Sequence, residues 1–153
     1  MEIPICPRGT TTTPPLPHQA MDHDAGYDLT AQESVIIPPQ GRAVVSTGWA
    51  VGIPAGYVGL IMSRSGLARN AGVIVLNAPG VIDPGYRGEV QIILHNTDPH
   101  TRHLVEPGDR IAQIVIVRTA HVEWSVVDQL SDSVRGEAGF GSSGTGSGGQ
   151  RPI

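Results

Sequence analysis

Short runs of Val and Ile, each ended by Gly or Pro, restrict most strongly what this chain can fold into. The 153 residues include 20 Gly and 13 Pro. The runs between them have the length and alternation of β-strands, expected at 34–37, 42–47, 57–62, 73–76, 89–96, 110–118 and 121–127. One helix of about two turns should begin near Ser65 and end at Gly72. The pattern predicts an all-β sandwich, barrel or jelly roll.

A change of composition near residue 135 divides the chain into two regions. The first, 1–134, is long enough for one domain with its own core. From Gly136 the sequence reads GEAGFGSSGTGSGGQRPI, with seven Gly in its first fourteen residues. Such a segment cannot bury enough apolar surface to fold alone. We therefore expect a β domain over 1–134 and a flexible Gly-rich arm over 135–153.

Composition and charge exclude several classes of function. The net charge is −4 and all ten basic residues are Arg, which argues against direct nucleic-acid binding. Cys6 is the only cysteine, so no internal disulfide forms and a reducing compartment is expected. His100 and His103 lie in a polar loop without the spacing of a metal site. With no leader peptide and no apolar run of membrane-spanning length, the protein is expected to be cytoplasmic and to have no membrane partner.

The stretch NAPGVIDPGYRGEV, 77–90, places an acid between an apolar run and a Pro-Gly turn. It predicts a β-hairpin with Asp83 at its tip and a type II turn that has Pro84 and Gly85 in the central positions. Tyr86 would then lie beside Asp83. Asp at this position also opens turns without any chemical role, and that alternative stays open.

Two further stretches carry chemistry, one where an expected strand turns into the helix and the other within a short extended segment. In SRSG, 63–66, Arg64 and a hydroxyl meet the start of the helix, where an anion such as phosphate is stabilised. The alternative is an N-cap serine beside a surface arginine. In DHDAGYDLTA, 22–31, Asp28 is placed to meet a hard cation such as Mg²⁺. An edge-strand acid facing solvent is the alternative reading.

The last two stretches are PGDRIAQIVI, 107–116, and the arm. Gln113 falls within an apolar strand, so its amide needs a partner from a ligand or from a neighbouring strand. Phe140 is the only phenylalanine and lies among glycines, with Arg135 before it and Ser142 and Ser143 after it. Such an aromatic would stack on a flat ligand while the arm surrounds an anion. Otherwise the arm is only a linker.

In order, these five stretches resemble the five motifs of the trimeric dUTP nucleotidohydrolases, or dUTPases. The matching segments are AGYDLTA, RSGLA, NAPGVIDPGYRGE, GDRIAQ and RGEAGFGSSG, between Ala25 and Gly144. Three positions depart from the family pattern: Ser63 stands where Pro is usual, Ala138 replaces Gly, and Ser143 replaces Thr.

The resemblance implies a jelly-roll-like β fold of the β-clip type, assembled as a homotrimer with sites at the subunit interfaces. It implies hydrolysis of dUTP to dUMP and pyrophosphate by water attack on the α-phosphate. That reaction limits uracil in DNA and supplies dUMP for dTMP synthesis. The C-terminal arm would close over bound substrate.

It also implies a role for individual residues. Asp83 would be the general base, Arg135 an arginine finger, and Tyr86 the residue that excludes a ribose. Asp28 would hold Mg²⁺ through water. The remaining contacts would be to uracil from Asn77, Gly80, Val81, Ile82 and Gln91, to the phosphates from Arg64, Ser65, Gly66 and Gln113, and from the arm through Phe140, Gly141, Ser142 and Ser143.

Two alternatives remain at this point. A dCTP deaminase shares the fold but uses a glutamate base, whereas the acid here is the Asp of GVIDPGY. A non-catalytic binding or signalling protein would bind the nucleotide without turnover.

Overall fold

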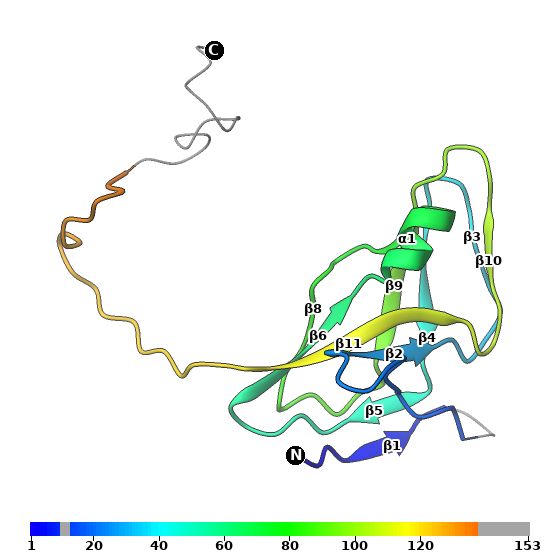
Figure 1. Cartoon of the computed structure of the whole chain (residues 1–153), viewed down its shortest axis with the longest axis horizontal. Coiled ribbons are helices and arrows are strands. Elements are labelled where there is room, and N and C mark those ends of the chain that lie inside the picture. The colour runs from blue at the N-terminus through cyan, green and yellow to red at the C-terminus, as the bar shows by residue number, and fades with distance from the viewer. Residues whose placement is uncertain (10–12, 138–153) are drawn as a thin grey trace, which may run out of the picture. The chain divides into compact units, whose positions relative to one another are not determined.

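The computed structural model describes residues 1–9 and 13–137, and its contacts divide the chain into the units Met1–His121 and Val122–Ile153. Within the described residues, the first unit contains every strand and the single helix, α1 (Ser65–Ala71) (Figure 1). The strands are β1 (Ile5–Pro7), β2 (Gly26–Thr30), β3 (Val35–Ile37), β4 (Arg42–Ser46), β5 (Trp49–Val51), β6 (Tyr57–Met62), β7 (Val73–Val75), β8 (Gly80–Ile82), β9 (Gln91–Asn96), β10 (His103–Val105) and β11 (Arg110–Arg118).

The strands form four antiparallel sheets. The largest has the order β2-β11-β6-β8, a second has the order β4-β9-β7, and the pairs β1-β5 and β10-β3 complete the set. Neighbours within the sheets are mostly far apart in sequence, as for β2 and β11. This topology confirms the predicted all-β class with one short helix for the described residues.

The core explains why these runs became strands. β9 alternates between buried and less buried positions, which directs Ile92 and Leu94 inward. On β11, Ile111 and Ile114 are buried while the face that carries Gln113 is more open. Alternation of this kind is what a sheet with one buried face requires. The core members are Leu29, Ala31, Ile37, Val45, Val51, Ile53, Ile61, Val73, Val75, Val90, Ile92, Leu94, Val105, Ile111, Ala112 and Ile114.

Helix α1 ends as its sequence predicts. Gly72 has φ 62° and ψ 20°, and its N–H bonds to the carbonyl of Ala68. Left-handed backbone of this kind favours Gly because a Cβ would clash. The prediction of two turns ended by Gly72 is therefore confirmed.

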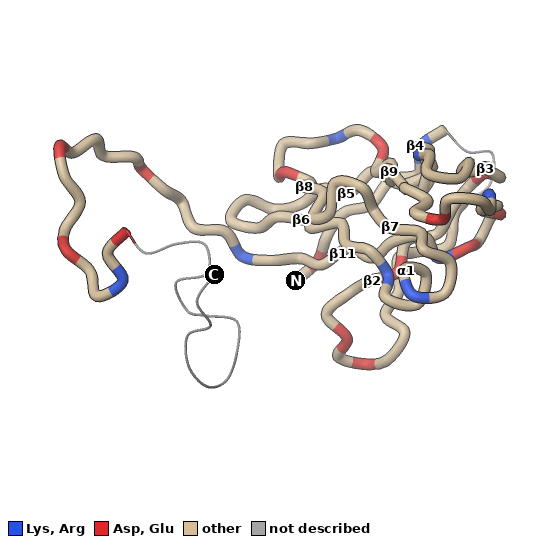
Figure 2. The backbone as a smooth tube through the Cα atoms, turned by 90° about the horizontal axis from the view of Figure 1, so that it is seen from above, with Lys and Arg blue, Asp and Glu red and all other residues tan. Residues whose placement is uncertain are grey.

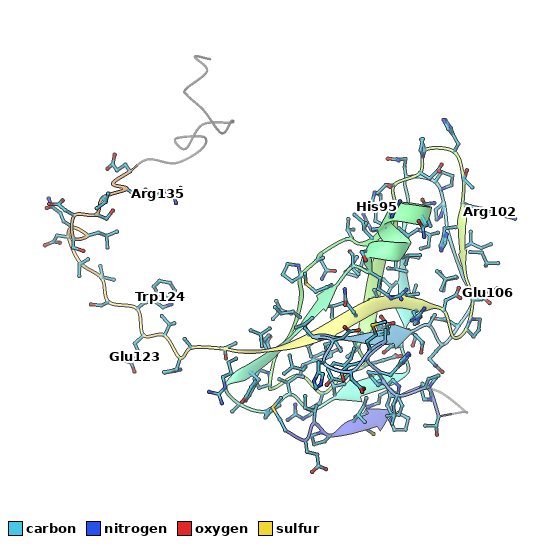
Figure 3. The ribbon with its side chains drawn as sticks, viewed as in Figure 1. His95, Arg102, Glu106, Glu123, Trp124 and Arg135 are labelled. Carbon is cyan, nitrogen blue, oxygen red and sulfur yellow. The ribbon has the colours of Figure 1, made fainter. Side chains whose placement is uncertain are left out.

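The second unit differs from its prediction. Residues 121–127 form no strand, and within this stretch the Trp124 side chain is 93% exposed. Figure 3 labels Trp124 and Glu123 on this extended segment. The predicted strand is wrong because a period-two pattern makes a strand only where a partner strand supplies hydrogen bonds, and the described residues supply none. The predicted division at 134/135 stays a prediction.

The loop between β9 and β10 is organised by one carboxylate. The backbone N–H groups of His100 and Thr101 donate to Asp98 Oδ1 at 2.8 and 2.7 Å. These bonds, that from His100 first, hold the pKa of Asp98 below its usual value. The buried Asn96 completes the loop by donating to the Thr101 carbonyl at 2.8 Å. No described helix has the length and apolar character needed to cross a membrane.

Candidate active site

Five predicted residues meet in one cavity, here called the Arg64 cavity. It has a volume of about 520 Å³ and lies where β6 passes into α1, beside β2 and β11. Its lining includes Asp28, Arg64, Ser65, Gly66 and Gln113. Figure 2 shows basic positions beside α1 and β2. Residues of the AGYDLTA, RSGLA and GDRIAQ segments, which are far apart in sequence, thus line one cavity of a single chain.

The start of α1 is not capped by a side chain. Arg64 occupies the N-cap position in extended conformation (φ −87°, ψ 127°), and the first turn contains no acid. The predicted N-cap role for a serine is therefore not what the structure shows. The uncapped end turns toward the Arg64 cavity through Ser65 and Gly66, which both line it. Uncapped N–H groups at a helix start attract an anion.

Asp28 is held by two arginines. Arg64 Nε lies 2.8 Å from Asp28 Oδ1, and Arg110 Nη1 lies 3.1 Å from Asp28 Oδ2. The Asp28 side chain is only 10% exposed, so its charge is balanced by these partners rather than by water. Arg64 also donates to the Arg110 carbonyl at 3.0 Å. An acid facing solvent at a sheet edge is thus excluded.

Arg110 is a site residue that the sequence reasoning missed. It lies three positions before Gln113 in the GDRIAQ segment, at the β11 end that pairs with Thr30 of β2. A regular alternation would not bring both Arg110 and Gln113 to the face of Asp28. A register shift between Arg110 and Ala112 makes this possible. Bulges cannot be read from alternation alone, but a charged residue at the start of a buried strand was a usable signal.

Gln113 obtains its partner from the neighbouring strand end. Its Nε2 donates to the Ser63 carbonyl at 3.0 Å. Its Oε1 lies against Gly26, where a Cβ would clash with it. Ser63 has a second contact, because its Oγ accepts a bond from the Val75 N–H at 2.8 Å. Ser63, which stands where the family usually has Pro, therefore links the Arg64 cavity to the end of β7.

The second group of predicted residues surrounds the Asp83 loop, defined as residues 83–88. Asp83 is exposed at the end of β8, and the Tyr86 N–H bonds to its carbonyl at 3.0 Å. The predicted turn therefore closes, but Gly85 does not have the positive φ that a type II turn needs. A turn with both central residues at negative φ closes the same bond, so the type II prediction is wrong.

The predicted hairpin is also wrong. β8 pairs with β6, whereas β9 pairs with β4 and β7 in another sheet. The Asp83 loop therefore carries the chain from one sheet to the other. Local turn residues predicted the reversal correctly, but the partner of each strand is decided by nonlocal packing.

Tyr86 and Asn77 each lie close to a glycine. The Tyr86 hydroxyl donates to the Glu89 carbonyl at 2.8 Å, and the ring lies against Gly88, where a Cβ would clash. Asn77 Nδ2 would be 3.3 Å from a Cβ at Gly80. Tyr86 and Asp83 are neighbours, as predicted. Around them, Val81 is exposed, Ile82 is half-buried, and Gln91 is exposed at the start of β9 opposite Ser46.

Asp83, Tyr86 and Asn77 do not line the Arg64 cavity. The two groups nevertheless share one face of the largest sheet. Asp28 and Gln113 are paired across β2 and β11, and Val81 follows in the next row through Leu60 and Val115. Arg135 lies in the second unit, while Phe140, Gly141, Ser142 and Ser143 are outside the described residues.

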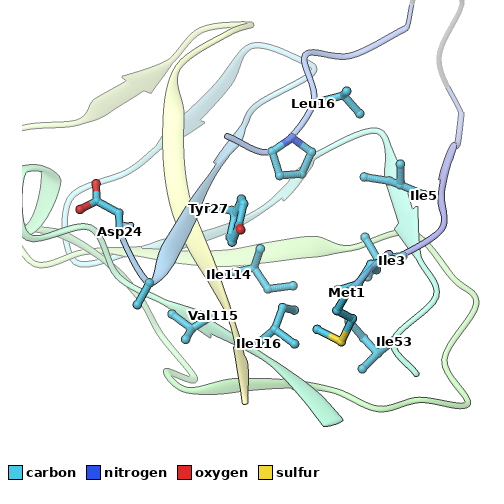
Figure 4. Close-up of a pocket in the computed structure, with 13 residues that line it drawn as sticks. Met1, Ile3, Ile5, Leu16, Asp24, Tyr27, Ile53, Ile114, Val115 and Ile116 are labelled. Atoms are coloured by element: carbon cyan, nitrogen blue, oxygen red, sulfur yellow. The ribbon is translucent and has the colours of Figure 1, made fainter. Parts of the chain in front are cut away.

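A second cavity of about 590 Å³ contains none of the predicted residues (Figure 4). Side chains of β1, β2 and β11 line it, including Ile5, Tyr27 and Ile114. Its walls are mainly apolar, and the polar side chains among them are those of Asp24 and Tyr27. Across the part of the chain that the structure describes, no cluster of three His, Cys, Asp or Glu residues could hold a metal.

Comparison with known sequences gives a consistent result. The family model described as dUTPase matches residues 12–144. The deoxyuridine 5'-triphosphate nucleotidohydrolase of Tropheryma whipplei (strain Twist) is 50% identical over 128 residues, which are 84% of this chain and 88% of the relative.

Comparison with solved structures agrees. A mutant dUTPase of Staphylococcus bacteriophage 80alpha with dUpNHpp has a TM-score of 0.82 at 34% identity, over 94% of this chain and 99% of that one. A mutant dUTPase from phage phi11 of S. aureus has a TM-score of 0.77 at 28% identity, over 84% and 98%. Its description names a structural Mg(II) ion. The jelly-roll-like β architecture predicted for this chain is confirmed.

Proposed function

The chain belongs to the dUTPase family and hydrolyses dUTP to dUMP and pyrophosphate, and from this premise we propose how its residues share the reaction. The observation that carries the proposal is the grouping of the predicted residues. Cationic and amide groups gather in the Arg64 cavity, and the acid Asp83 lies apart on an exposed loop. Phosphate binding and water activation are assigned to these two groups.

Asp83 is the general base. Its carboxylate orients the attacking water and accepts a proton as oxygen bonds to the α-phosphorus, while the bond from that phosphorus to the bridging oxygen breaks and pyrophosphate leaves. Exposure makes the carboxylate accessible to substrate, and the 3.0 Å bond between Tyr86 N–H and Asp83 carbonyl fixes its backbone. A positioned base contributes about 10² to 10⁴ in rate.

The nucleoside lies along β8 and the Asp83 loop. Backbone groups of Gly80, Val81 and Ile82, with Asn77 and the start of β9 at Gln91, recognise uracil. The proximity of the Asn77 amide to Gly80 supports this assignment, since it places a side-chain amide beside open backbone. Tyr86 packs under the deoxyribose and excludes a 2'-hydroxyl. Cytosine is rejected because its mismatched donors and acceptors would be buried without partners.

The phosphates lie in the Arg64 cavity. Arg64, the uncapped backbone at Ser65 and Gly66, and Gln113 are their ligands. The ion pair with Asp28 keeps the Arg64 guanidinium in place before substrate arrives, which lowers the entropy lost on binding. Arg110 is a positioning residue, because it holds Asp28 from the other side.

Asp28 fits Mg²⁺ held through water better than Mg²⁺ bound directly. Both of its oxygens already accept bonds from arginines, and a direct metal bond would displace one of them. A carboxylate oxygen has lone pairs for a water in addition. The metal, when bound, neutralises phosphate charge. Asp24, a second acid that lines the cavity, is available to the same water shell.

The enzyme is a homotrimer with its sites at subunit interfaces. The separation of Asp83 from the Arg64 cavity supports this, since one chain does not bring base and phosphate ligands into one cavity. The sheet face between them is apolar. Val81 is 58% and Val117 40% exposed, and Val58, Leu60 and Val115 lie beside them on the same face. An apolar face of this extent favours burial by another copy.

The arm completes the site. Arg135 stabilises charge on the phosphates as an arginine finger, Phe140 stacks on uracil, and Gly141, Ser142 and Ser143 contact the phosphates. These assignments follow from the family pattern. The expected cytoplasmic location likewise stays a prediction.

A pyrophosphate-release assay tests the proposal. With dUTP, dCTP and UTP as separate substrates and Mg²⁺ present, only dUTP should release pyrophosphate rapidly. Ammonia release from dCTP would instead indicate a deaminase, and binding of dUTP without turnover would indicate a binding protein. Either result would contradict the assignment of Asp83.

A further inference from the structure

Residues 89 and 90 join the Asp83 loop to the turn between β4 and β5. The Gly48 N–H donates to Glu89 Oε1 at 2.7 Å, and the Ser46 hydroxyl donates to the same oxygen. Val90 adds two backbone contacts, because its N–H donates to the Trp49 carbonyl at 2.7 Å and its carbonyl accepts from the Thr47 hydroxyl at 2.6 Å. The Glu89 carboxylate is thus the one charged group in this junction among the described residues.

The turn to which Glu89 is bonded is buried and closely packed. Thr47 is fully buried, and Gly48 is buried with φ 72°. A Cβ at Gly48 would lie 2.6 Å from Pro14 Cγ and 2.7 Å from Gln32 Cγ, so the backbone there is tightly enclosed. Buried backbone donors need partners, and the Gly48 N–H has the Glu89 carboxylate. Glu89 is therefore fixed to a rigid part of the core.

Tyr86 takes its position from Glu89. Its hydroxyl donates to the Glu89 carbonyl at 2.8 Å. The other bonds of the Asp83 loop are local or long: Tyr86 N–H to the Asp83 carbonyl at 3.0 Å, Arg87 Nη1 to the Pro84 and Tyr86 carbonyls at 2.5 and 2.7 Å, and Arg8 Nη2 to the Arg87 carbonyl at 3.5 Å. Apart from its chain connection to β8, Tyr86 is therefore linked to the core through Glu89.

We propose that Glu89 is a positioning residue for sugar selectivity. It does not touch the nucleotide. Its carboxylate anchors residue 89 to the β4–β5 turn, and the backbone of residue 89 then sets the height of the Tyr86 ring beneath the deoxyribose. The inference rests on the proposed role of Tyr86. A base role for Glu89 is unsuitable, because its side chain is half-buried and its bonded oxygen already accepts from two donors.

The test measures kcat/KM for dUTP and for UTP separately. In Glu89→Ala, the ratio of dUTP to UTP efficiency should fall by about tenfold, the factor that corresponds to roughly one net hydrogen bond. Glu89→Gln keeps an oxygen acceptor for the Gly48 N–H and should restore most of the ratio. Glu106→Ala, which removes an exposed acid from another loop, is the matched control and should leave it unchanged.

Thermal unfolding distinguishes a positioning role of Glu89 from a role in stability alone. If Glu89→Ala lowers the Tm yet keeps the parental dUTP:UTP ratio, or if Glu89→Gln is as unselective as Glu89→Ala, the proposal is wrong. Should Glu89→Ala not fold, Ser46→Ala removes one donor to the same oxygen and should lower the ratio by a smaller factor. An unchanged ratio in Ser46→Ala, with Tyr86→Ala unselective, would then overturn it.

Tyr86→Ala distinguishes this inference from the proposed function. If Tyr86→Ala itself keeps the parental selectivity, the role of Tyr86 fails and the role of Glu89 fails with it. If Tyr86→Ala loses selectivity and Glu89→Ala does not, only the inference about Glu89 fails.

Discussion

The Arg64 cavity and the Asp83 loop differ in how their chemical groups are held. At the Arg64 cavity, Asp28 is joined by ion pairs to Arg64 and to Arg110, which lies outside the cavity lining, and Gln113 is bonded to Ser63 just after β6. In the Asp83 loop, Asp83 is exposed, and its backbone carbonyl accepts a bond from the Tyr86 N–H. The proposed phosphate ligands are thus arranged by the chain itself. The proposed base is placed by the loop, and its carboxylate stays exposed.

This contrast separates two kinds of residue. A residue of the Arg64 cavity contributes both to the stability of the fold and to binding, since it replaces water around a buried partner. A residue such as Asp83 contributes to turnover alone. Substitutions in the Arg64 cavity should therefore lower stability and substrate binding, whereas substitution of Asp83 should lower turnover and leave stability unchanged.

Deleting residues 135–153 should have the largest effect on turnover while leaving both regions intact. The deleted segment lies in the second unit, outside the core residues. An arginine finger contributes about 10³ to 10⁵ in rate, so kcat for dUTP should fall by that order with little change in Tm. The truncated protein hydrolysing dUTP at the parental rate would show that the arm is only a linker.

Asp83→Asn should slow turnover by about 10² to 10⁴, because the amide keeps the shape but accepts no proton. Binding of a non-hydrolysable dUTP analogue, measured by calorimetry, should remain near the parental value. The Tm should not fall, since the bond from the Tyr86 N–H goes to the backbone carbonyl of Asp83, which the substitution keeps. The matched control is Asp22→Asn at another exposed acid. Near-parental turnover would exclude Asp83 as the base.

Asp28→Asn should show the opposite signature. Loss of the charge weakens the bonds to Arg64 and Arg110, so the free energy of unfolding should fall by about 1 to 3 kcal/mol. KM for dUTP should rise because Arg64 is no longer held in place. Urea unfolding of Asp28→Asn and Asp83→Asn under the same conditions compares their free energies of unfolding directly. Equal stability of the two variants would contradict the distinction between the regions.

Ser63→Ala should have the smallest effect. It removes the acceptor for the Val75 N–H, at a cost of about 1 kcal/mol. Ser63→Thr keeps the hydroxyl and serves as the control. Because Ser63 also supplies the carbonyl that Gln113 contacts, urea unfolding and KM for dUTP should both respond slightly. If Ser63→Ala and Ser63→Thr behave alike, the hydroxyl has no role in joining the Arg64 cavity to β7.

The elements that were predicted best are those whose residue pattern continues over a long stretch of the sequence. The expected ranges 57–62 and 110–118 agree with β6 and β11, and α1 ends at Gly72. The placement of Arg64, Ser65 and Gly66 was also predictable, because these residues lie where a strand passes into the helix. Asp28 and Gln113 lie within β2 and β11 and meet through the pairing of those strands. The strands β1, β2, β5 and β10 were not among the expected ranges. Residues 49–51 of β5 are all buried, so they show no alternation that could mark them.

Predictions that depended on partners were the ones that failed. The hairpin at Asp83 and the strand at 121–127 both assumed a pairing that local sequence cannot choose. The type II turn assumed a positive φ at Gly85 that the turn does not need. The anchoring of Glu89 by a buried turn was likewise invisible, because residues 46–48 and 89 meet only in the folded chain.

Mixing two inactive variants tests the central claim most directly, namely that base and phosphate ligands of one site come from different subunits. Asp83→Asn and Arg64→Ala would each be inactive alone. After co-expression and purification of mixed oligomers, some sites should combine an intact Asp83 from one subunit with an intact Arg64 from another. We predict that the mixture regains a substantial fraction of parental dUTP hydrolysis. Activity no higher than that of the two variants measured separately would contradict the account.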